Sequence, residues 1–155
     1  MNDEQVKFTL YSIGKISREV DCTYIELFDK YSLAIKELNH FSHIQVLWWA
    51  DKHDNEKSRN IMQTTPPYGE NPPVTGVFAT RAEYRPNPIG LTVAKIEEIN
   101  LAEGKIKVQN LDAFDDTPII DLKAYFPVCD RVKNASIPHW LVGWPEWFPD
   151  EGFGL

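Results

Sequence analysis

One short stretch of the chain concentrates side chains that are suited to binding a ligand. It covers residues 78–90 and reads Phe-Ala-Thr-Arg-Ala-Glu-Tyr-Arg-Pro-Asn-Pro-Ile-Gly. Pro86 and Pro88 fix two φ angles and remove two backbone donors, so this stretch cannot lie inside a sheet. Asn87 is restricted to an extended or turn conformation, because a proline follows it. The pattern predicts a stiff loop that connects two strands.

The side chains that this loop presents are Arg81, Arg85 and Asn87. Guanidinium and carboxamide groups on a rigid platform suit planar, anionic or nucleobase-like ligands, because they offer hydrogen bonds in a fixed plane. The competing interpretation is a proline-rich turn whose arginines make surface ion pairs of little energetic weight. The residue types alone leave both interpretations open.

A second concentration of polar side chains spans residues 115–125. Asp121, Lys123 and Tyr125 are spaced two positions apart, so on an extended segment their side chains point to one face. An acid, a base and a phenol on one face can orient a nucleophile and accept a proton. The simpler interpretation is a turn at residues 115–118 followed by an Asp–Lys pair on the surface.

The elements that must position these residues are mostly strands. A helix is predicted over residues 31–38, where apolar residues recur with helical spacing and Asp29 can serve as the N-cap. The run 41–50 is almost continuously apolar, so we expect a strand that is buried on both faces. Residues 51–73 form a long polar connection of the kind that is usually functional or mobile. The other predicted strands cover residues 6–16, 24–28, 74–79, 91–99, 105–111 and 119–122.

The order of these elements indicates the fold class. Strands outnumber helices and do not alternate with them, which argues against a doubly wound sheet. We predict a mainly β fold, a closed or nearly closed β-barrel with an inserted short helix. The length of 155 residues and the 43% of hydrophobic residues suit a single domain over residues 1–155.

Composition also limits the location and the cofactors of the protein. The chain has no apolar run long enough to span a bilayer, and residues 1–5 are polar and acidic, unlike a secretory signal. Cys22, Cys129 and the four histidines lack the spacing of metal ligands, so we predict no metal. Because two cysteines do not make a disulfide scaffold, we expect a cytoplasmic protein with reduced thiols.

The net charge of −7 opposes a nucleic-acid partner. The chain has 16 basic and 23 acidic residues, and its overall field repels phosphate. A local basic patch can still bind RNA, since salt screens distant charges beyond about 10 Å. The candidate patch is small and consists of Arg81, Arg85, Lys123 and Arg131.

Three blocks of this sequence resemble the TrmO family, whose members are also called TsaA-like proteins. Arg-Pro-Asn-Pro-Ile-Gly, preceded by Phe-Ala-Thr-Arg, is similar to the family signature. Residues 41–44 with the following aromatic run, and residues 115–125, are similar to the other two blocks and occur in the same order. The resemblance implies a β-barrel methyltransferase that uses S-adenosylmethionine and forms a homodimer. The family's best-known reaction methylates N6 of threonylcarbamoyladenosine at position 37 of tRNA.

The resemblance also assigns roles to residues. The substrate would be oriented by Arg85 and Asn87, and the reacting nitrogen by Asp121, Lys123 and Tyr125. The chain lacks a glycine-rich phosphate loop after a strand, so the cofactor would not be bound in the manner of dinucleotide-binding folds. The positions that match the family's cofactor contacts are Arg81, Leu91, Gln109, Asn110, Leu111 and Asp112.

Two alternatives to a tRNA methyltransferase remain open. The acidic charge favours a methyltransferase that uses the same cofactor on a small molecule. The chain also departs from the family pattern at Asp51, where a histidine is frequent. That departure favours a non-catalytic module that binds an adenosine-containing ligand or a protein partner.

Overall fold

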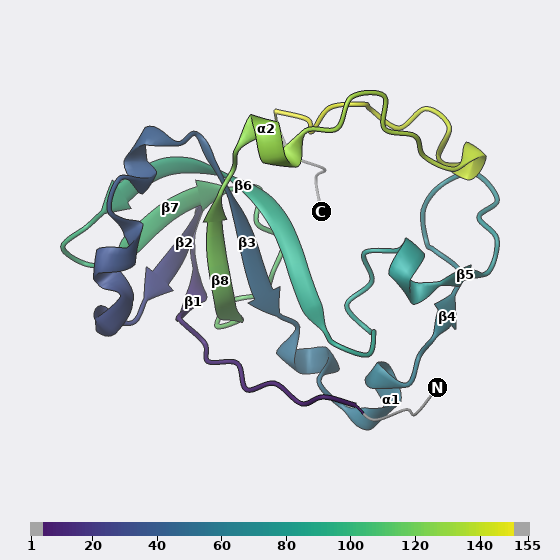
Figure 1. The fold of residues 1–155 in the computed structure, drawn as a ribbon, viewed down its shortest axis with the longest axis horizontal. Helices are drawn as coiled ribbons and strands as arrows, with labels where there is room; N and C mark the ends of the chain where they lie inside the picture. The colour runs from purple at the N-terminus through teal and green to yellow at the C-terminus, as the bar shows by residue number, and fades with distance from the viewer. Residues whose placement is uncertain (1–4, 151–155) are drawn as a thin grey trace.

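Six antiparallel strands close into a barrel in the computed structural model, which describes residues 5–150 (Figure 1). Around the barrel the strand order is β1-β2-β7-β6-β3-β8. The prediction of a mainly β fold with a closed barrel is therefore confirmed. The strand bounds are β1 (Gly14–Glu19), β2 (Cys22–Leu27), β3 (His43–Trp49), β6 (Ile89–Asn100), β7 (Lys105–Gln109) and β8 (Pro118–Ala124).

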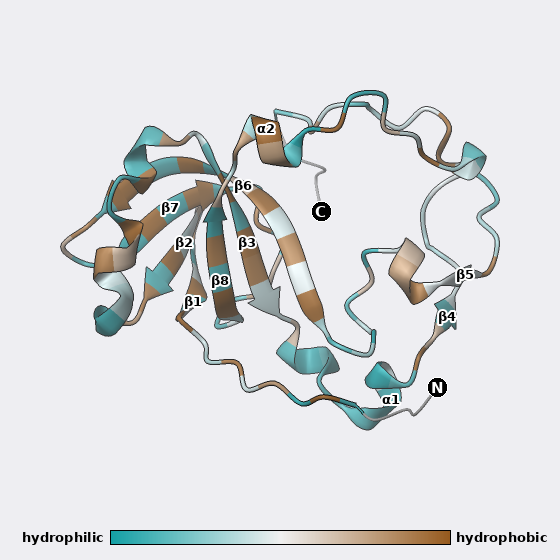
Figure 2. Ribbon diagram, viewed as in Figure 1, coloured by the Kyte–Doolittle hydropathy of each residue, from teal (hydrophilic) through white to brown (hydrophobic). Residues whose placement is uncertain are grey.

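Apolar side chains at alternate strand positions fill the barrel. Along β3, Ile44, Val46 and Trp48 are buried, whereas the residues between them are half-buried. The prediction that residues 41–50 are buried on both faces is wrong, because the outer face of a barrel strand stays near the surface. Alternating apolar and paler bands are visible along β6 as well (Figure 2). The other barrel strands contribute Ile16, Ile25, Ala94, Ile106 and Ile119 to the same core.

The pairing of β3 with β6 requires a glycine at position 90. Gly90 lies opposite Trp48, and a Cβ atom there would come within 2.1 Å of the Trp48 ring. Because the indole occupies that space inside the barrel, no larger residue fits without displacing it. The last residue of the stretch 78–90 thus serves the packing of the barrel.

The strand predicted over residues 6–16 begins later than expected. β1 starts at Gly14, and the side chains of Val6, Phe8 and Tyr11 are largely exposed. The backbone N–H of Ile13 still donates to the carbonyl of Ile119 at 2.8 Å. The ladder between β1 and β8 ends at Gly14 and Ile119, although β8 continues to Ala124, so the residues before Gly14 leave the sheet. We call residues 5–13 the arm.

Residues 29–40 form two 3-10 helices instead of the α-helix predicted over residues 31–38. Phe28 precedes the first of them and no side chain caps it, so Asp29 is not an N-cap. Glu37 has a φ of 68°, and this left-handed conformation separates the two helices. The bounds are η1 (Asp29–Ile35) and η2 (Leu38–His40).

The connection before β6 lies outside the barrel and is more structured than predicted. Only residues 75–76 of the predicted strand 74–79 are extended, and they pair with residues 63–64 in a separate two-stranded sheet. The bounds of its elements are η3 (Asp51–His53), α1 (Glu56–Arg59), β4 (Gln63–Thr64), β5 (Thr75–Gly76) and η4 (Val77–Ala79).

The remaining predicted strands are confirmed with small shifts of their ends. β2, β6, β7 and β8 cover most of the residues expected to be extended, and a turn at residues 101–104 joins β6 to β7. All four strands pair with a neighbour in the barrel. Their apolar and polar residues alternate because every second side chain points toward the core.

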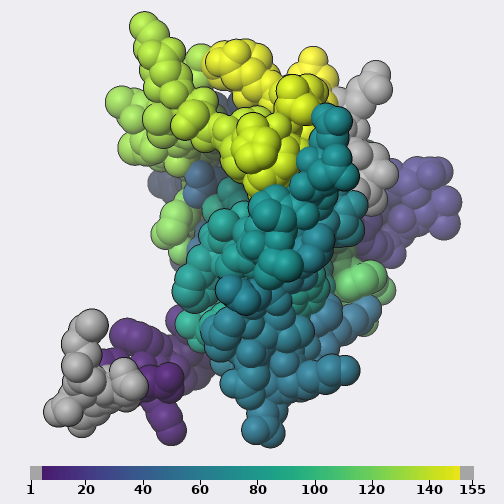
Figure 3. Space-filling model, turned by 90° about the vertical axis from the view of Figure 1, so that its right-hand side faces the viewer, coloured from purple at the N-terminus to yellow at the C-terminus, as the bar shows by residue number. Residues whose placement is uncertain are grey.

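The segment after β8 crosses to the loop between β4 and β5. Trp140 is buried there, and its ring stacks on Tyr68 with ring centroids 6.2 Å apart. Its carbonyl accepts a hydrogen bond of 2.7 Å from the backbone N–H of Glu70. Figure 3 shows this segment packed on the residues that precede β6. Its elements are α2 (Pro127–Asp130) and η5 (His139–Leu141).

Candidate functional site

The outer face of β6, β3 and β8 brings the two polar stretches of the sequence together. Leu91 on β6 lies opposite Leu47 on β3, and Leu47 in turn lies opposite Asp121 on β8. Directly paired residues project to the same face of a sheet, so Leu91 and Asp121 share the outer surface. Two strand spacings separate them, which is about 10 Å.

Arg81 and Leu91 meet at the start of β6. The guanidinium Nη1 of Arg81 donates to the carbonyl of Leu91 at 3.4 Å, and Arg81 itself is exposed. The side chain of Leu91 is 42% exposed. This end of β6 therefore offers a cation and an apolar surface side by side.

The corner formed by residues 109–112 lies next to the same end of β6. A carboxylate oxygen of Asp112 accepts a hydrogen bond of 2.9 Å from the hydroxyl of Thr92. That hydroxyl also accepts a bond of 3.1 Å from the indole Nε1 of Trp48. Leu111 is buried in the core, and Asn110 has a φ of 64° at the turn after β7. Arg81, Leu91 and Asp112 are thus brought to one place.

The side chain of Gln109 lies outside the cluster of Arg81, Leu91 and Asp112. Gln109 pairs with Lys95 in the ladder between β6 and β7, and its side-chain amide donates to Glu97. Its side chain is therefore engaged with charged groups further along β6.

Thr92 and Arg18 support this corner and were not identified from the sequence. Arg18 lies on β1 and donates through its guanidinium to the carbonyls of Leu111 and Ala113, the latter at 2.8 Å. These partners are 93 and 95 residues away in the chain, so no local pattern reveals the contact. Thr92 carries a weak signal, because it is a polar residue at an inward-facing position of a strand.

Asp121, Lys123 and Tyr125 share the outer face of β8, as the spacing predicted. The carboxylate of Asp121 and the ammonium of Lys123 form an ion pair of 2.7 Å. That carboxylate raises the pKa of Lys123 above its ordinary value. Lys123 therefore stays protonated at neutral pH, and within this pair only Asp121 can accept a proton.

Tyr125 follows the end of β8 and lies beside a histidine. Its backbone N–H donates to the carbonyl of His43 at 3.1 Å, and the two rings meet edge to face with centroids 6.2 Å apart. The hydrogen bond between the hydroxyl of Ser42 and Nδ1 of His43, at 2.8 Å, holds the imidazole ring. Backbone pairing thus places the ring of Tyr125 beside His43, just after the strand that carries the ion pair.

Arg85 braces the proline-containing loop from inside. Its Nη2 donates to the carbonyl of Val77 at 3.0 Å and to the carbonyl of Thr80 at 3.4 Å. Asn87 is exposed, and its backbone carbonyl accepts from the N–H of Ile89 at 2.7 Å. Of the two residues predicted to contact a substrate, Asn87 is thus open to solvent, whereas Arg85 is engaged by the loop itself.

A second brace comes from α1. Arg59 donates from Nη1 to the carbonyl of Pro86 at 2.8 Å and from Nε to the carboxylate of Asp54 at 2.7 Å. The indole of Trp49 also donates to Asp54 at 3.0 Å. The hydrogen bond from Arg59 lowers the pKa of Asp54. The carbonyl that precedes Asn87 is therefore fixed by a charged group.

His53 and Tyr84 tie the middle of the loop to the same region. Nε2 of His53 lies 3.2 Å from the carboxylate of Glu83, and its Nδ1 lies 3.4 Å from the hydroxyl of Ser58. The hydroxyl of Tyr84 is 3.0 Å from that of Thr64. The loop is irregular, as predicted, and its stiffness comes from these contacts as well as from its prolines.

Residues 5–150 contain neither a cluster of metal-ligating side chains nor a helix that could span a membrane. This part of the chain contains no group of three or more His, Cys, Asp or Glu residues that could hold a metal ion. Within the same residues, no helix has both the length and the apolar character needed to cross a bilayer.

Comparison with known proteins identifies the family. Residues 12–131 match the family described as the tRNA-methyltransferase O N-terminal domain. A protein of Methanocaldococcus jannaschii, named a probable S-adenosyl-L-methionine-binding protein, is 38% identical over 126 residues, which are 81% of this chain and 98% of the relative. An Archaeoglobus fulgidus protein, named an S-adenosyl-L-methionine-binding protein, is 43% identical over 72% of this chain and 75% of its own length.

Some relatives match this chain over only part of their own length. A mouse protein named tRNA (adenine(37)-N6)-methyltransferase is 34% identical over 72% of this chain but only 25% of its own length. The crystal structure of TrmO from Pseudomonas aeruginosa shares the fold with a TM-score of 0.66 at 24% identity, covering 84% of this chain and 61% of that one. The family match covers residues 12–131, and the Methanocaldococcus jannaschii relative aligns over 98% of its own length. The chain therefore belongs to the tRNA-methyltransferase O N-terminal domain family.

Proposed function

We propose that this protein binds S-adenosylmethionine and methylates tRNA, at N6 of threonylcarbamoyladenosine at position 37. The observation that carries the proposal is the pairing of β3 with β6 and β8, which puts Leu91 of the corner and the Asp121–Lys123 pair on one outer barrel face, while Thr92, the residue after Leu91, holds Asp112. The names of the archaeal relatives support the cofactor, and the name of the mouse relative supports the tRNA position.

The donor set at the corner fits the cofactor. The guanidinium of Arg81 suits its carboxylate, the carboxylate of Asp112 suits its hydroxyl or ammonium groups, and the exposed side chain of Leu91 suits its adenine ring. The turn at Asn110 would complete the wall of the site, whereas the side chain of Gln109 is engaged with Glu97 and that of Leu111 is buried in the core. When bound, S-adenosylmethionine supplies an electrophilic methyl group on a cationic sulfonium.

Positioning carries most of the catalysis in this proposal. The nitrogen that takes the methyl group is a carbamoyl or amide-like nitrogen, which is a weak nucleophile, and it must lose its proton. Holding it in line with the methyl group is worth roughly 7–11 kcal/mol of the barrier. Proton transfer to a side chain adds about 10²–10⁴-fold.

The residues divide these tasks by their chemistry. Asp121 accepts the proton, because Lys123 remains protonated beside it. Lys123 and the phenol of Tyr125 hold the polar groups around the nitrogen, and Asn87 presents its amide to the base edge. Arg85 acts through the loop that it braces.

The first experiment measures cofactor binding and product formation in Arg81→Ala. We expect micromolar binding of S-adenosylmethionine by the unaltered protein and a methylated nucleoside in tRNA digests analysed by mass spectrometry. Arg81→Ala should weaken cofactor binding about tenfold or more, because a charged hydrogen bond is worth roughly 1.5–3 kcal/mol. Lys36→Ala removes one positive charge from an exposed residue outside both the corner and the candidate basic patch, and serves as the control. Unchanged methyl transfer in Arg81→Ala would exclude this cofactor assignment.

A small-molecule acceptor is the second candidate, because the chain carries a net charge of −7. The same cofactor site would then serve a different methyl acceptor. Cofactor binding without any methylated nucleoside in tRNA would favour this candidate. The absence of cofactor binding at millimolar concentration would favour the non-catalytic module instead.

A homodimer in the cytoplasm forms part of the same proposal. The outer face around the corner keeps large apolar side chains at the surface, with Phe78 79%, Ile89 36% and Leu91 42% exposed. Such a surface is suited to a second copy of the chain. A mass in solution of twice 17.9 kDa supports the dimer, and a mass of 17.9 kDa contradicts it.

A further inference from the structure

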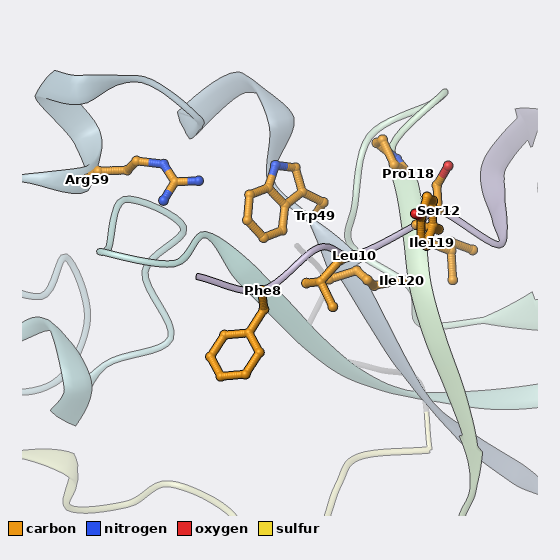
Figure 4. Close-up of a pocket in the computed structure, with 9 residues that line it drawn as sticks. Phe8, Leu10, Ser12, Trp49, Arg59, Pro118, Ile119 and Ile120 are labelled. Carbon is orange, nitrogen blue, oxygen red and sulfur yellow. The ribbon is translucent and has the colours of Figure 1, made fainter. Parts of the chain in front are cut away.

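A cavity of about 380 Å³ lies where the arm passes the end of β3. The arm contributes Phe8, Leu10 and Tyr11, while Trp49 and Arg59 line the other side (Figure 4). The volume is at the lower end of the range of small-ligand sites, and three of the nine lining residues, Phe8, Tyr11 and Trp49, are aromatic. This cavity is separate from the Arg81–Leu91–Asp112 corner.

The aromatic side chains of the arm are displayed to solvent. Phe8 is 83% exposed and Tyr11 is 71% exposed, although a soluble chain usually covers such side chains. The arm has no strand partner, and Figure 3 shows it standing away from the body of the molecule. Two exposed aromatic faces beside a cavity are typical of a surface that stacks on a planar ligand.

The opposite wall is rigid and carries one guanidinium group. Arg59 lies over the ring of Trp49, with its Cζ atom 5.4 Å from the ring centroid. Asp54 holds both side chains, at 2.7 Å from Arg59 and 3.0 Å from Trp49. The charge of Asp54 is thus balanced by Arg59, so the wall is close to neutral and offers π surfaces and N–H donors.

The position of the cavity connects it to the proposed substrate. Arg59 also donates to the carbonyl of Pro86 at 2.8 Å, which directly precedes Asn87 in the loop. A ligand on Arg59 and Trp49 is therefore next to the loop that presents Asn87. In a single RNA strand, the groups next to a target base are its neighbouring bases.

We propose that this cavity binds an unpaired nucleobase of the RNA, adjacent to the target nucleotide, between the arm and the Trp49–Arg59 wall. The inference rests on the proposed tRNA function for its choice of ligand. It also explains how a chain of net charge −7 can hold RNA, because stacking on aromatic rings needs no dense basic patch. RNA binding should therefore depend only weakly on salt. The logarithm of the binding constant should fall with the logarithm of the salt concentration with a slope of about −0.7 for each phosphate that is contacted.

The test compares a double variant of the arm with a matched control. Phe8→Ala combined with Tyr11→Ala changes two exposed side chains, so folding should be unaffected. Val6→Ala alters a 75% exposed residue of the same arm that does not line the cavity. The probe is an anticodon stem–loop RNA with adenosine at position 37, and fluorescence anisotropy gives its dissociation constant.

The double variant should bind this RNA about 5- to 150-fold more weakly for each base that stacks. Val6→Ala should bind as tightly as the unaltered protein. The dissociation constant of S-adenosylmethionine should not change in either variant. In methyl-transfer assays on the same stem–loop carrying threonylcarbamoyladenosine at position 37, the KM for RNA should rise in the double variant while kcat at saturating RNA stays the same.

An abasic RNA identifies the ligand of the cavity. Removing the base on one side of adenosine 37 should weaken binding to the unaltered protein by the same factor as the double variant. Combining the abasic RNA with the double variant should add no further loss, because both changes remove one interaction. Independent effects of the two changes would overturn the proposal.

Other outcomes separate this inference from the proposed function. RNA binding that is unchanged in the double variant overturns the nucleobase site even if tRNA is methylated. Loss of RNA binding in the double variant supports the site even if no methyl group is transferred. A change of solution mass in the double variant, with unchanged RNA binding, would assign the arm to contact with a second copy. No RNA binding by the unaltered protein also overturns the inference.

Discussion

Thr92 shows how a single hydroxyl connects the barrel core to the candidate site. It accepts a hydrogen bond from the indole of Trp48 and donates one to the carboxylate of Asp112. A hydroxyl can do both at once, whereas an amide N–H can only donate. The carboxylate at the corner is therefore oriented by a residue that faces inward.

At the outer face, Asp121 and Lys123 form a pair in which the carboxylate of Asp121 keeps Lys123 protonated. The raised pKa of Lys123 follows from its contact of 2.7 Å with Asp121. With Lys123 protonated, the carboxylate of Asp121 is the member of the pair that can take up a proton. The proposed reaction assigns that role to Asp121.

Asp121→Asn tests this assignment. The amide keeps the shape of the side chain but cannot take a proton, so kcat for methyl transfer should fall about 10²–10⁴-fold. The dissociation constant of S-adenosylmethionine should stay the same, because Asp121 lies two strands away from the cofactor corner. Calorimetric titration and single-turnover rates measure the two quantities.

The matched control is Asp116→Asn. Asp116 is an exposed carboxylate in the turn before β8, and it pairs with Lys15 at 2.6 Å. Its loss should leave kcat unchanged. An equal fall of kcat in both variants, or full activity in Asp121→Asn, would show that the proton goes elsewhere.

At the scale of elements, β3 is the strand that assembles the site. It pairs with β6 along one edge and with β8 along the other, so it carries both polar stretches on one surface. Its register with β6 depends on the close contact between Trp48 and Gly90. The packing inside the barrel and the geometry outside it are therefore coupled through this pair of strands.

Gly90→Ala should destabilise the barrel strongly. The new methyl group would lie 2.1 Å from the indole of Trp48, and overpacking of this kind costs about 1–3 kcal/mol or more. Urea unfolding at constant temperature gives the free energy of unfolding. We expect a lower midpoint than in the unaltered protein, together with weaker cofactor binding because β6 shifts.

Gly76→Ala provides the comparison for this experiment. The residue has a φ of −63°, and the nearest atom to a new Cβ is 4.0 Å away. The change should be neutral or stabilising by about 0.4–1 kcal/mol, because it reduces the freedom of the unfolded chain. A similar loss in both variants would mean that Gly90 has no special packing role.

At the scale of the whole molecule, the barrel and the connection before β6 are linked by the segment after β8. Trp140 is the main contact, since it is buried against Tyr68 and its carbonyl is held by Glu70. Gly69 packs so closely on it that a Cβ atom would lie 2.6 Å from the Trp140 carbonyl. The segment after β8 therefore holds the loop between β4 and β5 in place.

Trp140→Ala should separate the segment after β8 from the loop between β4 and β5 without unfolding the barrel. Trp140 is not part of the barrel core, so the loss of its packing should affect mainly residues 131–150. Limited proteolysis should then cleave in this range much faster than in the unaltered protein, and the main unfolding midpoint should move little. Trp147→Ala removes a 61% exposed ring and should leave the cleavage pattern unchanged. Equal cleavage in both variants would show that Trp140 does not hold the two segments together.

The sequence by itself determined the local features of this protein. The two prolines impose an irregular loop at residues 86–88, and strict alternation predicts strands such as β6 and β7. The three ordered blocks identified the family, and the spacing of Asp121, Lys123 and Tyr125 placed them on one face. All of these depend on residues that are close together in the chain.

Only the tertiary structure decided which of these features meet. The arm was predicted as part of a strand but lies outside the barrel, since the ladder between β1 and β8 starts only at Gly14. Arg18 reaches the corner across more than 90 residues, and β3 joins Leu91 to Asp121 through a register that no local pattern encodes. Strand pairing and packing are long-range interactions whose outcome depends on the whole barrel, so the site exists only once the barrel has closed.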